Sequence, residues 1–267
     1  MKPVSLILDL LRTYPDKGTS VRNIMASGSM FGFSENLMRV SLTRLVAKNT
    51  IENFQRGYYR LSRASDPVND LVEQWRSGEA RLKPWKPDTW LCVHASTGDS
   101  LLPHAVWALT NYGFRPVVDQ LWIRPDNLRL ESAQLSASLQ SIGLPTTAVL
   151  LTGAGVPKVH GSAWFRAFDV AALNQGYIDM TQDLMSSMAR LSALPASAAK
   201  KQSFQLGGRA IQLLVKDPLI PEQFQSPANR ELLWKVMLEY DEAGRKVWSD
   251  SAMAAPDEIP TQRIEAI

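Results

Sequence analysis

The chain has 267 residues, of which 45% are hydrophobic and 21% charged, so it is long enough for more than one globular domain. It contains no run of about 18 apolar residues, so no membrane-spanning helix is expected. The N-terminal stretch lacks the longer apolar core of a secretory signal. A single cysteine, Cys92, excludes an internal disulfide and fits a reducing compartment. These features together predict a cytoplasmic protein.

The charge is unevenly distributed along the chain. Residues 1–65 hold ten lysines and arginines and four acidic residues, a net charge of +6, whereas the remainder has a net charge of −3. A basic segment at one end of a slightly acidic chain favours a polyanionic partner such as nucleic acid.

The basic segment is predicted to form three helices and a hairpin. The first helix is indicated by apolar residues at helical spacing, namely Val4, Leu6, Ile7, Leu10 and Leu11. It ends before Pro15 and Gly18, and a second helix covers 21–30. A third helix over 35–48 begins after Ser34, which is a good N-cap residue. Two β-prone runs, 50–54 and 58–61, flank Gly57 and predict the hairpin.

This succession of three helices and a hairpin within about 60 residues is the plan of a winged helix-turn-helix, so a DNA-binding domain of this kind is predicted over 1–64. The third helix is predicted to bury Met38, Leu42, Leu45 and Val46. Its opposite face carries Asn36, Arg39, Thr43 and Ala47, flanked by Arg44 and Lys48. A helix of this kind fits the major groove of duplex DNA, where Arg can bind guanine and Asn can bind adenine.

Eight residues of this region have a predicted role in DNA binding. Asn36 and Arg39 are candidates for base edges, and Thr43 for a thymine methyl group or a phosphate. Arg44 and Lys48 suit phosphate oxygens. At the hairpin, Arg56, with Gln55 and Tyr58, suits the minor groove or the flanking backbone. The alternative for Arg39 and Arg44 is an internal salt bridge or a solvated side chain.

The rest of the chain is predicted to form a connector, an α+β domain and a helical domain. The connector covers 65–88 and includes an amphipathic stretch. Strands over 90–95, 117–123 and 146–151 alternate with helices over 101–112 and 130–142, which end at Gly113 and Gly143. This succession predicts a ferredoxin-like α+β domain over 89–170. Helices over 173–194, 204–215 and 229–248 predict a helical domain over 171–267, with a loose tail after Ala254.

Several runs resemble the PaaX family of phenylacetic acid degradation repressors, in the family's order. They are residues 34–48 of the third helix, 56–62 of the hairpin, 112–116 and 121–125 of the α+β domain, and 215–221, which read Val-Lys-Asp-Pro-Leu-Ile-Pro. The resemblance implies a winged helix-turn-helix, a middle domain similar to the ferredoxin-like Cas2 fold, and a helical C-terminal dimerisation domain.

The same resemblance implies a function. It implies a homodimer that binds double-stranded DNA at a palindromic operator and represses an aromatic-acid catabolic operon. Release would come from an aryl-CoA effector, typically phenylacetyl-CoA, with no cofactor and no enzymatic activity. Two positions depart from the family pattern: Asn49 replaces a glycine after the third helix, and residues 222–229 lack the usual Leu-Pro and Trp-Pro-Gly segment. The effector, its pocket residues, the operator sequence and the choice between repressor and activator are therefore left open.

Two alternatives belong to other functional classes. One is a nucleic-acid-binding accessory protein without ligand control. The other is a Cas2-like metal-dependent nuclease, which needs an acid at the end of the first strand, but residues 90–96 contain none. His94, His104 and His160 have no metal-ligand spacing.

Two further motifs are predicted to have structural roles. Gly153–Lys158 matches neither glycine-rich phosphate fingerprint and is predicted to be a loop turn, with Lys158 kept as a candidate contact for a CoA phosphate. Cys92 and His94 share one face of the predicted strand. Nothing else supports a catalytic pair, so Cys92 is predicted to be a buried small residue.

Overall fold

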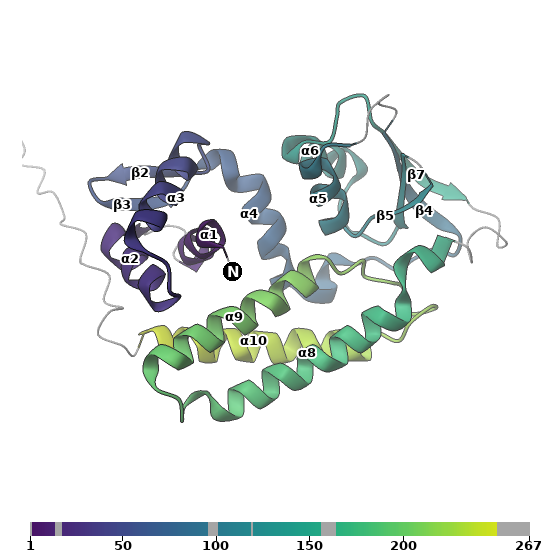
Figure 1. The fold of residues 1–267 in the computed structure, drawn as a ribbon. Coiled ribbons are helices and arrows are strands. Elements are labelled where there is room, and N and C mark those ends of the chain that lie inside the picture. The colour runs from purple at the N-terminus through teal and green to yellow at the C-terminus, as the bar shows by residue number, and fades with distance from the viewer. Residues whose placement is uncertain (1, 14–17, 96–100, 119, 156–163, 250–267) are drawn as a thin grey trace, which may run out of the picture. The chain divides into compact units, whose positions relative to one another are not determined.

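The computed structural model describes residues 2–13, 18–95, 101–118, 120–155 and 164–249. It confirms a mixed α+β protein with two small antiparallel sheets and a helical C-terminal region (Figure 1). The chain separates into two compact units. The first holds residues 1–69, 191–204 and 242–267, and the second holds 70–190 and 205–241. The expected tail after Ala254 lies outside the described residues.

The N-terminal part of the first unit consists of three helices and a small sheet. The helices are α1 (Pro3–Thr13), α2 (Val21–Met30) and α3 (Glu35–Ala47), close to the predicted bounds. The strands β1 (Thr19–Ser20), β2 (Ile51–Gln55) and β3 (Tyr58–Leu61) form an antiparallel sheet in the order β1-β3-β2. Leucines of α1, Ile24 of α2 and Ile51 of β2 share one core with the inner face of α3.

The inner face of α3 differs from the prediction at one position. Val46 is 41% exposed, and Ser41 is buried instead, so the buried stripe consists of Met38, Ser41, Leu42 and Leu45. The Ser41 hydroxyl donates a hydrogen bond of 2.8 Å to the Leu37 carbonyl oxygen, which satisfies its polar group inside the core. At the start of α1, Val4 is likewise exposed and does not extend the apolar stripe.

The stretch predicted as a connector is largely helical. It contains a short 3-10 turn (Arg63–Ser65), α4 (Asp66–Glu73) and a 3-10 segment, Gln74–Arg81, which is kinked at Gly78. Leu71 and Trp75 are almost completely buried. Their amphipathic pattern is therefore used to pack this stretch against the core of the second unit.

The sheet of the second unit has four strands and is antiparallel throughout. Its elements follow the order β4 (Thr89–His94), α5 (Pro103–Asn111), β5 (Arg115–Val118), β6 (Leu121–Pro125), α6 (Ser132–Ile142) and β7 (Val149–Gly155). The strand order is β5-β6-β4-β7. Alternate residues of β4 face opposite sides: Leu91 and Val93 pack with α5 and α6, whereas Trp90 and Cys92 pack with Phe165 and Phe168.

Two predictions for this sheet are wrong. The single strand expected over 117–123 is a hairpin of β5 and β6, and Gln120 between them has a φ of 63°. The strand expected over 146–151 begins at Val149, and Gly153 and Gly155, expected in a loop, belong to it. The register between β4 and β7 shifts near Gly153, whose φ of 60° suits a bulge.

The helical region consists of α8 (Val170–Leu191), α9 (Ala196–Val215) and α10 (Ala228–Ser249). In the second unit these helices pack around Trp75, Tyr177, Leu184 and Tyr240, and the hydroxyl groups of Ser187 and Tyr240 lie 2.7 Å apart. The helix expected over 204–215 begins eight residues earlier, at Ala196. None of the described helices combines the length and apolar character that a membrane span requires.

Candidate functional site

The candidate DNA-binding helix, α3, presents its predicted polar residues to solvent. Ser34 is its N-cap, and the Ser34 hydroxyl accepts a hydrogen bond of 3.3 Å from the Leu37 amide. Asn36, Arg39, Thr43, Arg44 and Lys48 are all exposed. The α-helical period places Asn36 and Thr43 opposite the buried stripe. The outer face is therefore built as the amphipathic pattern predicts.

Arg39 is engaged in an ion pair within its own helix. Its Nε and Nη2 atoms both donate to Oε1 of Glu35, at 2.9 and 2.5 Å. Both side chains are more than half exposed, at 60% and 63%. An exposed pair at this spacing stabilises a helix by only about 0.3–0.5 kcal/mol. The guanidinium group can thus exchange Glu35 for another partner at little cost.

Two other cations lie towards the end of α3. Arg44 stands in its last turn, and Lys48 is the C-cap residue. No ion pair involves either side chain within the described part of the chain. Asn49 follows with a φ of 53°, so it adopts the left-handed conformation that the usual glycine would provide. Its carbonyl oxygen accepts a hydrogen bond from the Ser62 hydroxyl, which connects the end of α3 to the end of the hairpin.

The hairpin β2–β3 places Arg56 at its exposed turn, beside Gly57 with a φ of 77°. Gln55 and Tyr58 flank the turn and are partly buried. Lower in the hairpin, Arg60 pairs with Glu52 at 2.5 Å, and its guanidinium lies 4.8 Å from the Phe54 ring centroid. Arg56 is therefore the cation that the hairpin presents, while Arg60 stabilises the two strands.

The sequence pattern missed two exposed apolar residues of α3. Leu37 is 44% exposed and Val40 is 39% exposed. Val40 falls between Asn36 and Thr43 on the outermost stripe of the helix. The exposure of Val40 could have been inferred from the helical period, because the stripe opposite Met38 and Leu45 includes position 40.

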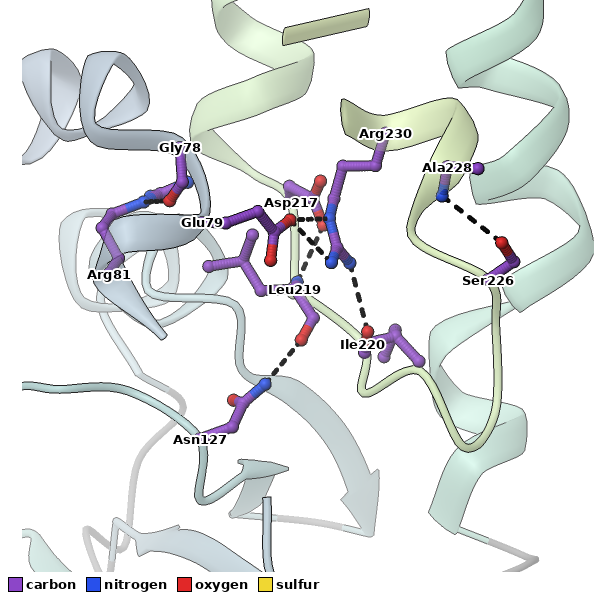
Figure 2. Close-up of polar contacts among 10 residues, drawn as sticks. All are labelled: Gly78, Glu79, Arg81, Asn127, Asp217, Leu219, Ile220, Ser226, Ala228 and Arg230. Atoms are coloured by element: carbon purple, nitrogen blue, oxygen red, sulfur yellow. Dashed lines mark hydrogen bonds and ion pairs between the residues drawn. The ribbon is translucent and has the colours of Figure 1, made fainter. Parts of the chain in front are cut away.

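A second cluster of polar residues lies in the second unit, around residues 216–221. This segment is irregular, yet residues 217–221 are buried. Side chains satisfy its carbonyl groups: Arg115 donates to Lys216, Asn127 to Leu219 and Arg230 to Ile220, at 3.0, 2.7 and 3.1 Å. The Asp217 carboxylate accepts a hydrogen bond of 2.7 Å from the Leu219 amide (Figure 2).

The charged groups of this cluster are buried to different extents: the side chain of Arg230 is 6% exposed, and that of Glu79 is 38% exposed. Arg230 forms an ion pair of 2.8 Å with Glu79 (Figure 2). Burial disfavours its charge, but Asp217 and Glu79 outweigh this effect and raise the pKa of Arg230. Arg124 is completely buried and donates to the carbonyl oxygen of Tyr112 at the end of α5. Its burial lowers the pKa of Arg124 to about 9.

A small cavity adjoins the cluster and is lined by Trp75, Glu79, Asp217 and Trp234, among others. Among the described residues, Trp75 Nε1, Asp217 Oδ2 and Trp234 Nε1 are buried without a hydrogen-bond partner. The cavity has room for about one water molecule, far less than the ~300–1,000 Å³ of a small-molecule site. No effector residues are assigned to it.

The structure describes the remaining sequence motifs only in part. Cys92 is buried, as predicted, and its burial raises the pKa of the thiol to about 11, which disfavours a reactive thiolate. Lys158 lies outside the described residues. Within the described ranges, no three His, Cys, Asp or Glu residues are placed to hold a metal ion.

Comparisons with known proteins show a fold and no family. No protein-family model matches the chain, and no curated protein matches it. The solved structure of the uncharacterized protein Rv0674 from Mycobacterium tuberculosis is similar, with a TM-score of 0.54 and 16% sequence identity. The likeness covers 92% of this chain and 98% of that chain. At this identity the chain shares a fold with that protein, and the likeness carries no function.

Proposed function

We propose that the chain is a DNA-binding transcriptional regulator that contacts duplex DNA with α3 and the β2–β3 hairpin. The observation that carries this proposal is the outer face of α3. Asn36, Arg39, Thr43, Arg44 and Lys48 are exposed together on a capped helix whose opposite stripe is buried. Such a helix fits the major groove with its polar face towards the base edges.

The arrangement of elements supports the same proposal. Three helices followed by an antiparallel hairpin fit a winged helix-turn-helix, in which α3 is the recognition helix. The succession β4-α5-β5-β6-α6-β7 with the order β5-β6-β4-β7 fits a ferredoxin-like domain. A helical region follows. This is the layout that the PaaX resemblance implies.

Binding would divide the contacts between bases and backbone. Asn36 and Arg39 would contact base edges in the major groove, and Arg44 and Lys48 would contact phosphates. Arg56, with Gln55 and Tyr58, would contact the minor groove or the backbone beside it. A homodimer would place two copies of α3 on the half-sites of a palindromic operator.

Regulation is proposed from the resemblance alone. The protein would repress an aromatic-acid catabolic operon and release the operator when an aryl-CoA thioester such as phenylacetyl-CoA binds. No effector residue is named, because the described cavity is too small for an aryl group. The second candidate is a nucleic-acid-binding accessory protein without ligand control.

The DNA-binding proposal is tested by selecting binders from a random duplex pool at low salt and measuring the enriched site by fluorescence anisotropy. We expect a palindromic site. The Lys48→Ala variant should weaken binding to all duplexes alike and reduce the slope of log K against log salt by about one. The control is Lys235→Ala, which removes an exposed lysine from α10. Absence of any enriched duplex refutes the proposal.

The effector proposal is tested on the same site by titration with phenylacetyl-CoA, with coenzyme A as the control. Release by the thioester and not by coenzyme A supports the aryl-CoA effector. Unchanged binding with phenylacetyl-CoA and a panel of other aryl-CoA thioesters rejects ligand control of this kind and favours the accessory protein.

A further inference from the structure

We infer that the centre of α3 recognises thymine methyl groups through Val40, Thr43 and Ala47. This inference rests on the proposed DNA-binding function and names the bases that the helix prefers. The three positions are spaced i, i+3 and i+7, so they form one stripe along the helix. All three side chains are exposed.

The stripe lies at the centre of the outer face. The residues buried beneath α3 are Met38, Ser41, Leu42 and Leu45. At 100° per residue, positions 40, 43 and 47 fall on the side opposite these four. The cations Arg39 and Arg44 fall to either side of the stripe. Apart from the Thr43 hydroxyl, these three side chains are apolar where α3 would enter a groove most deeply; the charged groups border them, and Asn36 lies on the same side one turn before Val40.

The side chain of Thr43 has a constrained orientation. Its Oγ1 atom donates a hydrogen bond of 3.1 Å to the Arg39 carbonyl oxygen one turn earlier. This bond holds the hydroxyl against the helix backbone and fixes the side-chain rotamer. The methyl group is then the part of Thr43 available to a ligand. Of the roles predicted for Thr43, a thymine methyl contact is favoured over a phosphate contact.

The chemistry of the flanking groups identifies duplex DNA as the partner. Thymine alone presents a methyl group in the major groove, and apolar side chains such as Ala and the Thr methyl contact it. Arg44 and Lys48 are exposed beside the stripe and complement the negative charge of a polyanion. An apolar groove of another protein would not provide that negative charge. Asn36 precedes Val40 by one turn and suits adenine, so we expect consecutive A·T pairs at the centre of each half-site.

The test replaces single thymines of the selected duplex with deoxyuridine, which removes only the methyl group. We expect about a fourfold loss of affinity at each contacted thymine, the effect of one buried methyl group. Val40→Ala, which shortens the apolar side chain, should reduce the loss at one thymine. Thr43→Ser, which lacks the methyl group, should abolish it at another, whereas Thr43→Val should preserve it.

Controls separate this inference from the proposed function. Arg56→Ala, at the hairpin, should weaken binding but leave every deoxyuridine effect intact. Circular dichroism checks that each exposed substitution leaves the protein folded. A duplex that binds equally well with thymine and deoxyuridine, or losses that persist undiminished in both Val40→Ala and Thr43→Ser, would overturn the inference while DNA binding stands. If no duplex binds, the proposed function itself fails.

Discussion

At the scale of single residues, Arg39 shows how a side chain can be held ready for a partner. Its guanidinium pairs with Glu35, one turn earlier on the same exposed face. The pair contributes little to stability because both groups remain in water. Glu35 would also face the phosphates of a bound duplex, where its charge is unfavourable.

Arg39→Ala should therefore cost roughly 1–3 kcal/mol of binding free energy and relax specificity at one base pair. Glu35→Gln should increase affinity, because it releases the guanidinium and removes a negative charge from the interface. Anisotropy titrations with the selected duplex and its single-base variants measure both effects. Unchanged binding by the Arg39→Ala protein would show that Arg39 has no base contact.

Cys92 gives a prediction about reactivity and pH. Burial raises the pKa of its thiol from 9.0 to about 11, so at pH 8 its thiolate fraction is about 100-fold lower than that of an unperturbed thiol. We expect Ellman's reagent to label the folded protein very slowly and the denatured protein at once. The raised pKa favours the folded state below pH 9, and this contribution is lost as the pH rises through about 11. Rapid labelling of the folded protein would contradict this burial.

The residues of α3 also show a limit of prediction from hydropathy patterns. The sequence predicted the three polar residues that share the outer side of α3 with Ala47 and the two cations that flank them, but it placed Val46 in the core. Hydropathy ranks valine above serine as a core residue. Hydropathy does not indicate that the Ser41 hydroxyl donates a hydrogen bond to the Leu37 carbonyl oxygen, which lowers the free-energy cost of burying it.

At the scale of elements, helix ends are set by a few positions. Gly113 follows the end of α5 with a φ of 79°, as its predicted capping role requires. A Cβ atom at this position would lie 2.9 Å from the Pro218 Cα atom and 3.1 Å from Arg124 Nη1. The glycine is needed both for its conformation and for this close approach.

Gly113→Ala should reduce the free energy of unfolding by about 2 kcal/mol or more, since strain and a backbone clash combine. The matched control is Gly208→Ala in α9, where a Cβ atom would meet nothing within 4 Å. Because alanine favours a helix interior, this control should stabilise the protein by about 1 kcal/mol. Urea denaturation measures both, and equal effects of the two substitutions would refute the role given to Gly113.

Elements were predicted well where the apolar period was strong. The bounds of α1, α2 and α3 and the hairpin followed from the sequence, but the turn at Gln120 was missed because no glycine or proline marks it. The first turns of α9 were missed for another reason. Residues 196–203 contain no large apolar side chain, so they show no period, although their alanines and lysines favour a helix.

At the scale of the whole molecule, the second unit is built from two separate stretches of chain. Asp217 helps to join them. Its carboxylate accepts a hydrogen bond from the Leu219 amide, and its charge attracts Arg81, Arg115 and Arg230. The 215–221 motif could be recognised in the sequence, but the residues that would satisfy it could not be predicted. Arg115 lies about 100 positions before Lys216 in the sequence, and Asn127 lies 92 positions before Leu219.

Asp217→Ala should destabilise the protein by about 3–5 kcal/mol, because it removes one counter-charge of the arginines around it and leaves the buried Leu219 amide without its acceptor. Asp183→Ala is the control: its partner Arg209 is 64% exposed, so we expect a loss below about 1 kcal/mol. Thermal and urea unfolding of both variants measure the difference. A loss for Asp217→Ala as small as that of the control would show that the arginines are satisfied without it.

The Leu219 amide also has a consequence for hydrogen exchange in deuterated solvent. Loop amides ordinarily exchange within seconds through local fluctuations, since water reaches them directly. This amide lies in an irregular segment, yet its acceptor and its surroundings are buried. Its deuterium uptake should therefore follow the slowest helices of the second unit, so that a stretch without regular structure reports the opening of the whole unit.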